Sequence, residues 1–308
     1  MRRAMLSLAA LLAATPALAA PRVIASVVPI HSIVAAVMGA AGSPELLLSG
    51  QLPEHRASFT AAQVAALGKA DLVFIAGRGL EAKLAQLSGS EAVNGKVFIE
   101  LAAVAGVHTL PVRVGGAWDA DHDGDAPAAD GEAQGVLAFD PHVWLDPENA
   151  KAMAAAAATE LGLADPANAA TYGANAKAFA ASLDATTAGI ITELAPVKDR
   201  PFIVFHDAYQ YFERRFGLLA AGSITDISAR APSAERLKGI RDKLAASKAV
   251  CVFREPQYDD KVVTTVTEGS NARGGVLDPL GAGLIPGPAA YSELLQNLAA
   301  SIRTCLAG

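Results

Sequence analysis

The sequence predicts an α/β protein with two lobes, each built on a small parallel sheet flanked by helices, joined by one long rigid helix. Two series of short apolar segments alternate with helical patterns, the first from residue 23 to 99 and the second from residue 201 to 277. Such alternation is typical of parallel sheets with helical crossovers. Between the two series, one apolar face recurs at helical spacing over roughly 29 residues, which as a helix would extend about 43 Å. That length would reach along both lobes.

Turn and capping signals delimit the individual elements. The expected strands lie at residues 23–28, 45–48, 72–75, 97–99, 201–205, 218–220, 249–253 and 275–277. Thr60 and Gln63 have the spacing of a capping box, and Gly68 marks the end of the helix that they open. Asp146-Pro147 has the pattern of an N-cap followed by proline in the first helical turn, and Asp165-Pro166 repeats it before the long helix.

We expect the chain to divide into a signal peptide at 1–20, an N-terminal lobe at 21–165, a linking helix at 166–195 and a C-terminal lobe at 196–308. The predicted signal peptide has arginines at its start, then an apolar stretch, and ends in Ala17-Leu18-Ala19, a small-x-small cleavage signal. Its apolar stretch is too short to span a bilayer. We therefore expect secretion to the periplasm, with no stable membrane insertion of the mature chain.

Bulk composition narrows the function classes. The 308 residues are 52% hydrophobic and 18% charged, which favours a globular protein, and the formal net charge is -6. A mildly acidic chain is a poor partner for nucleic acid, and none is expected. Residues 115–135 are rich in Gly, Ala and Asp and have no hydrophobic periodicity, so we expect a long solvated acidic loop there.

The two cysteines, Cys251 and Cys305, leave two possibilities. They could be unpaired thiols in the core, or they could form a disulfide. The oxidising compartment that the signal peptide indicates favours the disulfide. It would close a loop of about 55 residues and contribute roughly 4 kcal/mol in the chain-entropy model.

Candidate ligands follow several of the predicted strands. His55 comes after the strand at 45–48 and His206 directly after the strand at 201–205, while Glu255 and Asp278 follow two later strands of the second series. In open parallel sheets, ligands bind in the crevice outside the carboxyl ends of the strands. His142 lies between the acidic loop and the next predicted helix. These positions indicate a binding site between the two lobes.

Three imidazoles, from His55, His142 and His206, form a donor set suited to Zn²⁺, which accepts nitrogen ligands in tetrahedral sites. Asp278, Glu54 or a water molecule would complete the site. Mn²⁺ and Mg²⁺ favour more carboxylate oxygens. The alternative for each histidine is an ordinary structural role with hydrogen-bonded ring nitrogens, which is our interpretation of the two remaining histidines outside the acidic loop and the candidate site, His31 and His108.

Five segments resemble the zinc-specific solute-binding proteins of bacterial ABC importers, part of a wider class that also binds manganese. The resemblance covers nearly the whole mature chain, in the expected order. The matching segments are Pro53-Glu54-His55, Pro141-His142-Val143-Trp144-Leu145-Asp146-Pro147, Phe205-His206-Asp207-Ala208-Tyr209, Cys251-Val252-Phe253-Arg254-Glu255-Pro256-Gln257 and Leu277-Asp278-Pro279-Leu280-Gly281.

The resemblance implies roles for particular residues. His55, His142 and His206 fall on the three histidine ligands of the family, and Asp278 matches the acid that completes the site in many relatives. Manganese-binding relatives generally carry glutamate at the position of His206, so histidine there points to zinc. The two cysteines match a disulfide pair of similar zinc-binding proteins. We therefore expect a monomeric protein, not an enzyme, that captures Zn²⁺ as transported ligand and delivers it to the membrane permease of an ABC importer.

Two alternatives stay open at this point. The chain could capture manganese or iron with the same fold, or it could be a zinc-dependent hydrolase in which Glu54 or Glu255 acts as base beside a metal-bound water. The sequence holds none of the common hydrolase or nucleotide-binding motifs. One feature departs from the family: the loop at 115–135 is acidic with a single histidine, His122, where zinc-binding relatives often have a histidine-rich segment.

Overall fold

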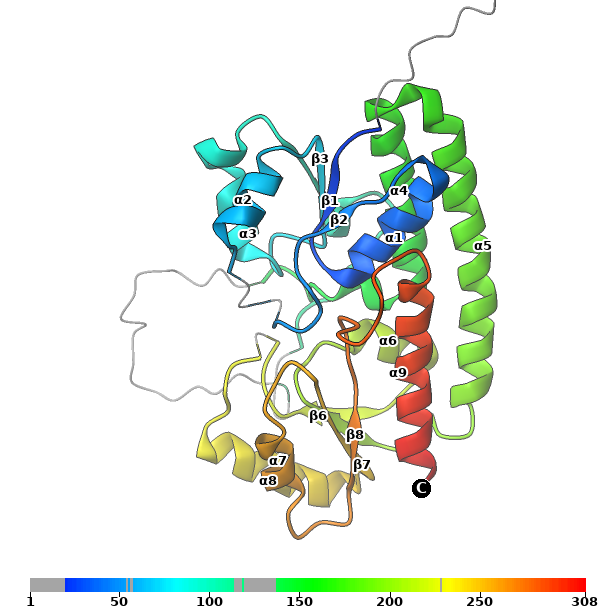
Figure 1. Ribbon diagram of the computed structural model, residues 1–308. Helices are drawn as coiled ribbons and strands as arrows, with labels where there is room; N and C mark the ends of the chain where they lie inside the picture. The colour runs from blue at the N-terminus through cyan, green and yellow to red at the C-terminus, as the bar shows by residue number, and fades with distance from the viewer. Residues whose placement is uncertain (1–19, 54, 56–57, 114–117, 119–136, 228) are drawn as a thin grey trace, which may run out of the picture.

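The computed structural model describes residues 20–53, 55, 58–113, 118, 137–227 and 229–308. The predicted signal peptide up to residue 19, nearly all of the predicted acidic loop at 115–135, and Glu54 lie outside the described residues. Figure 1 shows two α/β units, one above the other, with a long helix running beside both.

The first unit contains a four-stranded parallel sheet in the order β2-β1-β3-β4. Its strands are β1 Val23–Ala25, β2 Glu45–Leu46, β3 Leu72–Ile75 and β4 Val97–Glu100. Its helices are α1 Val28–Met38, α2 Ala61–Leu67 and α3 Ala82–Ser88, with 3-10 turns at Gly39–Ala41, Glu91–Val93 and Leu101–Ala103. The capping box at Thr60 and Gln63 is present, and α2 ends before Gly68, as the sequence predicts.

The second unit contains another four-stranded parallel sheet, in the order β6-β5-β7-β8. Its strands are β5 Phe202–Val204, β6 Ala220–Ser223, β7 Cys251–Arg254 and β8 Arg273–Val276. Its helices are α6 Gln210–Phe216, α7 Ala234–Ser247, α8 Lys261–Thr267 and α9 Ala290–Ala307. The two sheets share one strand order, although no repeat is visible in the sequence.

The strand predicted at 218–220 is wrong in position, because β6 begins only at Ala220. Leu219 is 51% exposed, whereas the buried positions of β6 are Gly222 and Ser223. Hydrophobicity therefore pointed to residues just before the strand. The small residues that the strand buries gave no apolar signal.

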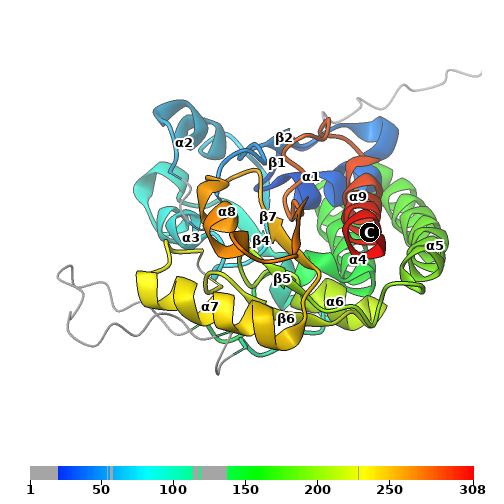
Figure 2. The ribbon, with the colours of Figure 1, turned by 90° about the horizontal axis from the view of Figure 1, so that it is seen from below.

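One long helix packs against elements of both units. After a 3-10 turn at Pro166–Asn168, α5 extends over 26 residues, Ala169–Leu194, or about 39 Å. It lies against α1, α9 and the preceding helix α4, Pro147–Ala164, which has Asp146 as its N-cap. Figure 2 shows α4, α5 and α9 together along one side of the molecule. The predicted fold class, including the long helix, is confirmed.

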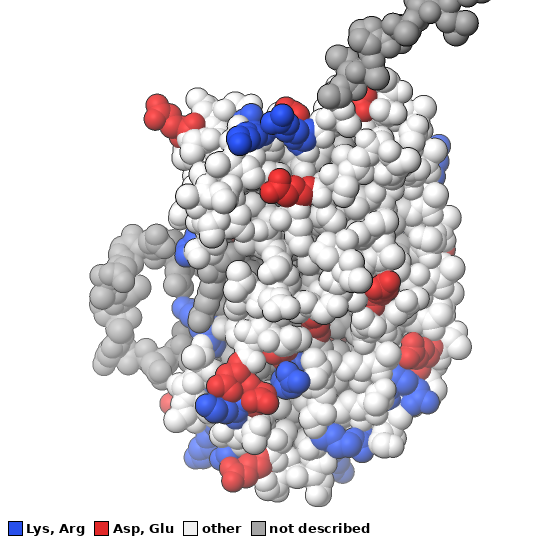
Figure 3. Space-filling view, in the orientation of Figure 1, with Lys and Arg blue, Asp and Glu red and all other residues white. Residues whose placement is uncertain are grey.

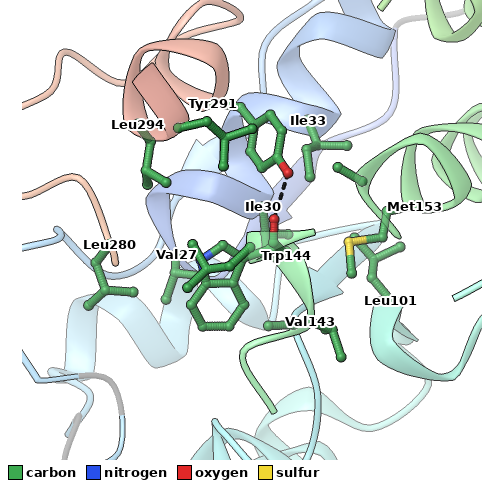
Figure 4. Close-up of a cluster of buried hydrophobic side chains, with 14 of the residues drawn as sticks. Val27, Ile30, Ile33, Leu101, Val143, Trp144, Met153, Leu280, Tyr291 and Leu294 are labelled. Atoms are coloured by element: carbon green, nitrogen blue, oxygen red, sulfur yellow. Dashed lines mark hydrogen bonds between the residues drawn. The ribbon is translucent and has the colours of Figure 1, made fainter. Parts of the chain in front are cut away.

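A single hydrophobic cluster continues through both units. At its centre the indole of Trp144, fully buried in the 3-10 turn Val143–Leu145, donates a hydrogen bond to the carbonyl of Pro279 at 2.9 Å. The hydroxyl of Tyr291, at the start of α9, donates to the carbonyl of Trp144 at 2.6 Å (Figure 4). Burial of this apolar surface and satisfaction of its polar groups hold the two units together.

The disulfide joins Cys251, the first residue of β7, to Cys305 in the last turns of α9, with 6.1 Å between the Cα atoms. The pairing expected from the sequence is present. It ties the terminal helix to a central strand of the second sheet.

We predict that replacing Cys251 and Cys305 together by alanine lowers the free energy of unfolding by about 4 kcal/mol, because the bridge restricts a long loop of the unfolded chain. Urea unfolding of the oxidised protein and the double variant measures this. The wild-type protein under a reducing agent should match the variant. Equal stability of all three samples would contradict a contribution from the bridge.

Glu81 is a buried carboxyl group at the carboxyl end of β3. Its two oxygens accept hydrogen bonds from the backbone N–H groups of Ala76, at 3.1 Å, and Gly77, at 2.9 Å. Burial raises the pKa of Glu81 from its ordinary 4.5 to about 7, although these hydrogen bonds oppose the shift. The folded state therefore favours the protonated form of Glu81.

This shift predicts a pH dependence of stability. Since the folded pKa is raised, the contribution of Glu81 is fully present below pH 4.5 and is lost as the pH rises through 7. The loss amounts to about 3 kcal/mol. In Glu81→Gln this decrease in the free energy of unfolding with rising pH should disappear. The exposed control Glu91→Gln should keep the decrease. Urea unfolding of the metal-free proteins at pH 5 and pH 8 tests the prediction, and equal slopes in all three would contradict it.

One face of the described residues has no concentration of a single charge. The face in Figure 3 carries few charged side chains, and basic and acidic ones are interspersed on it. Within the described ranges, no helix is both long enough and apolar enough to cross a bilayer.

Candidate metal centre

His142 is fully buried and directly precedes the 3-10 turn that contains Trp144. Its Nδ1 lies 2.8 Å from a carboxylate oxygen of Asp140, which also accepts the backbone N–H of His142 at 3.0 Å. A carboxylate only accepts hydrogen bonds, so this contact assigns the imidazole proton to Nδ1. The Nε2 atom faces His206.

His206 has the equivalent arrangement in the second unit. It follows β5, and its Nδ1 lies 2.7 Å and 2.8 Å from the two carboxylate oxygens of Glu255. Glu255 follows β7, the neighbour of β5, so both residues come from the carboxyl edge of one sheet. Both side chains are buried. The Nε2 atom of His206 is thereby presented away from Glu255.

The third imidazole comes from the loop after β2. The ring of His55 lies 5.3 Å from that of His142 and 5.8 Å from that of His206, centroid to centroid. His55 is half-buried, whereas the other two histidines are buried. One ring nitrogen from each of the three histidines lies within 4.8 Å of the other two.

The spacing of the three histidines suits a single ion. The Nε2 atoms of His142 and His206 are 3.3 Å apart. Nitrogens bound at about 2.0–2.1 Å to a tetrahedral zinc ion lie roughly 3.3–3.4 Å from one another. The two buried histidines thus already have the separation of one edge of the tetrahedron, and His55 stands near a third corner. Hydrogen bonds from Nδ1 to carboxylates are the usual outer partners of zinc-bound histidines.

Asp278 does not belong to this group of three among the described residues. Its carboxylate accepts the backbone N–H groups of Leu280 at 3.1 Å, Gly281 at 2.9 Å and Ala282 at 2.5 Å. It also accepts the side-chain amide of Gln257 at 2.9 Å. Three of these donors meet Oδ1, and only that of Ala282 meets Oδ2.

Charged side chains beside the three histidines are paired. Arg113 makes ion pairs with Asp207, the residue after His206, and with Glu213 in α6, where Nη1 and Oε2 are 2.6 Å apart. Burial raises the pKa of Asp207, and the guanidinium of Arg113 opposes that shift. Arg113 also lies over the ring of Trp118, at 3.5 Å from the centroid. The two ion pairs tie the segment before residue 114 to the second unit.

The remaining described histidines have no part in this group. The Nε2 atom of His31 lies 3.0 Å from the carbonyl of Pro44, and the ring is buried. Burial lowers the pKa of His31, which favours the neutral ring. His108 is exposed, and its backbone N–H donates to Asn149 at 2.8 Å. Both positions agree with the structural or surface roles expected from the sequence.

Comparison with known proteins identifies the family. A family model described as the periplasmic component A of the zinc-uptake complex, ZnuA, matches residues 23–305. The chain belongs to this ZnuA family. The high-affinity zinc uptake system protein ZnuA of Brucella abortus is 43% identical over 305 residues, covering 92% of this chain and 91% of that protein.

Other members of the ZnuA family agree. The ZnuA protein of Paracoccus denitrificans is 35% identical, covering 96% of this chain and 94% of its own. A crystal structure of ZnuA superimposes with a TM-score of 0.76 at 28% identity, covering 93% of this chain and 99% of the other. The two-sheet architecture is therefore the ZnuA architecture.

Sequence reasoning missed one partner of the candidate site. Asp140 contacts His142 as Glu255 contacts His206, yet only Glu255 stood out, because it follows a strand. Asp140 lies in no strand or helix, and a carboxyl group two residues before a histidine gave the only signal. The bonds of Asp278 to the turn after it were also not foreseen.

We predict that Glu255→Gln weakens zinc binding by about ten- to a hundredfold, because the neutral amide is a poorer partner for the Nδ1–H of a zinc-bound His206. Asp140→Asn should act similarly through His142. The exposed control Glu235→Gln should bind as the wild type does. Competition titration with a zinc chelator measures all four, and wild-type affinity in both buried variants would contradict the assigned roles.

Proposed function

We propose that this protein captures Zn²⁺ in the periplasm through His55, His142 and His206 and delivers it to the membrane permease of an ABC importer. The observation that carries the proposal is the convergence of three ring nitrogens within 4.8 Å, drawn from both sheets and from the segment before α4. Membership of the ZnuA family supports it. In this proposal zinc is the cargo, and the chain releases it unchanged.

The donor set favours zinc over the alternatives of manganese or iron. Three imidazole nitrogens suit a borderline-soft ion with tetrahedral preference, whereas Mn²⁺ favours oxygen ligands. The fold alone does not choose the metal. FpvC of Pseudomonas aeruginosa, whose structures hold Ni²⁺ or Mn²⁺, superimposes with a TM-score of 0.75 at 23% identity. Selectivity therefore rests on the side chains at the site, above all on His206.

The fourth position of the site is open to water, to Glu54 or to Asp278. Asp278 accepts four hydrogen bonds from its own turn and from Gln257, and it lies outside the group of three ring nitrogens. Three protein nitrogens plus water is a familiar zinc environment. We therefore favour water.

The proposal also covers the export of the chain and the arrangement of its mature part. Residues 1–20 act as a signal peptide for export, and the mature chain works as a monomer with lobes at 21–165 and 196–308. The linking helix, 166–195, holds the lobes at a fixed distance. His55 is the most exposed of the three proposed ligands.

A binding role also accounts for the carboxylates near the site better than a hydrolase does. A hydrolase needs a base beside the metal-bound water. Both oxygens of Glu255, one of the two residues considered for that role, lie against Nδ1 of His206. One oxygen of Asp140 likewise lies against Nδ1 of His142. These groups orient ligands, and their oxygens point to imidazoles.

We predict that His206→Ala weakens zinc binding by more than about a hundredfold, since losing a ligand costs more than losing an outer partner. His108→Ala, at an exposed position away from the site, should bind normally. Calorimetric titration of the metal-free proteins gives both affinities. Unchanged binding in His206→Ala would refute the proposed ligand set.

We further predict that zinc displaces manganese from the wild-type protein even when manganese is in large excess. Zinc should also raise the melting temperature more than manganese does at equal concentration, because the tighter ligand stabilises the folded state by mass action. Thermal scans with each metal, alone and together, test this. Preferential stabilisation by Mn²⁺ would favour manganese capture instead.

A further inference from the structure

A tight turn of the second lobe, Asp278 to Ala282, lies against Gly50 of the first lobe. The carboxylate of Asp278 binds three successive backbone N–H groups and so fixes the shape of the turn. Gly281 within it has a φ of +74°, in the left-handed region that favours glycine. We call residues 278–282 the Asp278 turn.

Gln257 connects this turn to the first lobe. Its side-chain nitrogen donates to Asp278 at 2.9 Å and to the backbone carbonyl of Gly50 at 2.7 Å. Both contacts need an N–H donor, so they also fix the orientation of the amide. Gln257 is partly buried, and Gly50 is buried. One amide group thus bridges the two lobes and binds the Asp278 turn at the same time.

The backbone of Gly50 also packs directly on the Asp278 turn. A Cβ atom placed on Gly50 would lie 2.9 Å from the nitrogen and 3.0 Å from the Cα of Ala282, and 3.1 Å from the carbonyl carbon of Gly281. Only glycine permits this approach. The side chain of Gln51 adds a longer contact, 3.4 Å, to the carbonyl of Ala282.

These contacts adjoin each of the three histidines along the chain. Gly50 lies five residues before His55. Gln257 lies two residues after Glu255, the partner of His206. The Asp278 turn accepts the indole of Trp144, two residues after His142, through Pro279. Gly50 on the turn therefore anchors the loop that leads to His55.

We propose that Gln257, Asp278 and Gly50 form an inter-lobe latch that positions His55 over the two buried histidines and slows the release of bound zinc. This inference rests on the proposed zinc-binding function. Gln257 and Asp278 act as positioning residues, and they do not coordinate the ion. Since His142 and His206 are buried, departure of the ion requires His55 to move first, and the latch opposes that movement.

The sharpest test is Gln257→Glu, which keeps the shape of the side chain but removes the N–H donor and places a carboxylate against Asp278 and the carbonyl of Gly50. The latch predicts zinc release at least about tenfold faster, the equivalent of one lost hydrogen bond. An effect of charge alone predicts the opposite, because an added negative charge near the site should retain the cation longer. Gln296→Glu, at an exposed position of α9, controls for the charge.

A second variant, Gly50→Ala, disrupts the contact of the first lobe with the Asp278 turn without changing any polar group. The added Cβ has to push the Asp278 turn away, so release should again be faster by about tenfold. Gly283→Ala is the matched control, because a Cβ there meets no atom within 4 Å. It should release zinc at the wild-type rate.

Stopped-flow mixing of the zinc-loaded full-length mature proteins with excess chelator measures the release rates. Thermal unfolding of the same proteins without metal separates a latch from general damage to the fold. The latch requires faster release in Gln257→Glu and Gly50→Ala, with melting temperatures of the metal-free proteins near that of the wild type. Wild-type or slower release in Gln257→Glu overturns it, as does faster release that merely follows a loss of stability. Failure of the wild-type protein to bind zinc would instead refute the proposed function itself.

Discussion

The structure depends on two buried imidazoles that meet across the lobes, Nε2 to Nε2, at 3.3 Å. The Nδ1 atom of each ring is hydrogen-bonded to a buried carboxylate, which is Asp140 for His142 and Glu255 for His206. The two Nε2 atoms therefore face each other. Two imidazole nitrogens at this separation have the spacing of neighbouring ligands on one tetrahedral zinc ion.

The scaffold explains how residues so far apart in the chain reach this geometry. His55 and His206 follow strands of two different parallel sheets, at the carboxyl edge where such sheets bind ligands. The long helix α5 and the shared hydrophobic core fix one sheet relative to the other. Trp144 and Tyr291 complete this link through hydrogen bonds next to His142.

Much of this could be predicted from the sequence, because periodicity and capping signals are local. The α/β class, the long helix and the capped starts of α2 and α4 follow from them, and the placement of His55 and His206 after strands follows from the same pattern. The partners of the ligands could not be predicted in this way. Whether Glu255 faces His206, or Asp278 binds its own turn, depends on how separate segments pack, and spacing along the chain carries no trace of it. The shift of β6 has a similar cause, since Gly222 and Ser223 are buried without being apolar.

X-ray absorption at the zinc edge of the loaded protein tests the central claim most directly. If His55, His142 and His206 bind one ion together, the spectrum should show four light-atom neighbours at about 2.0–2.1 Å, with the outer-shell scattering of three imidazole rings. A spectrum with six oxygen neighbours, or with the scattering of one imidazole or none, would contradict the account.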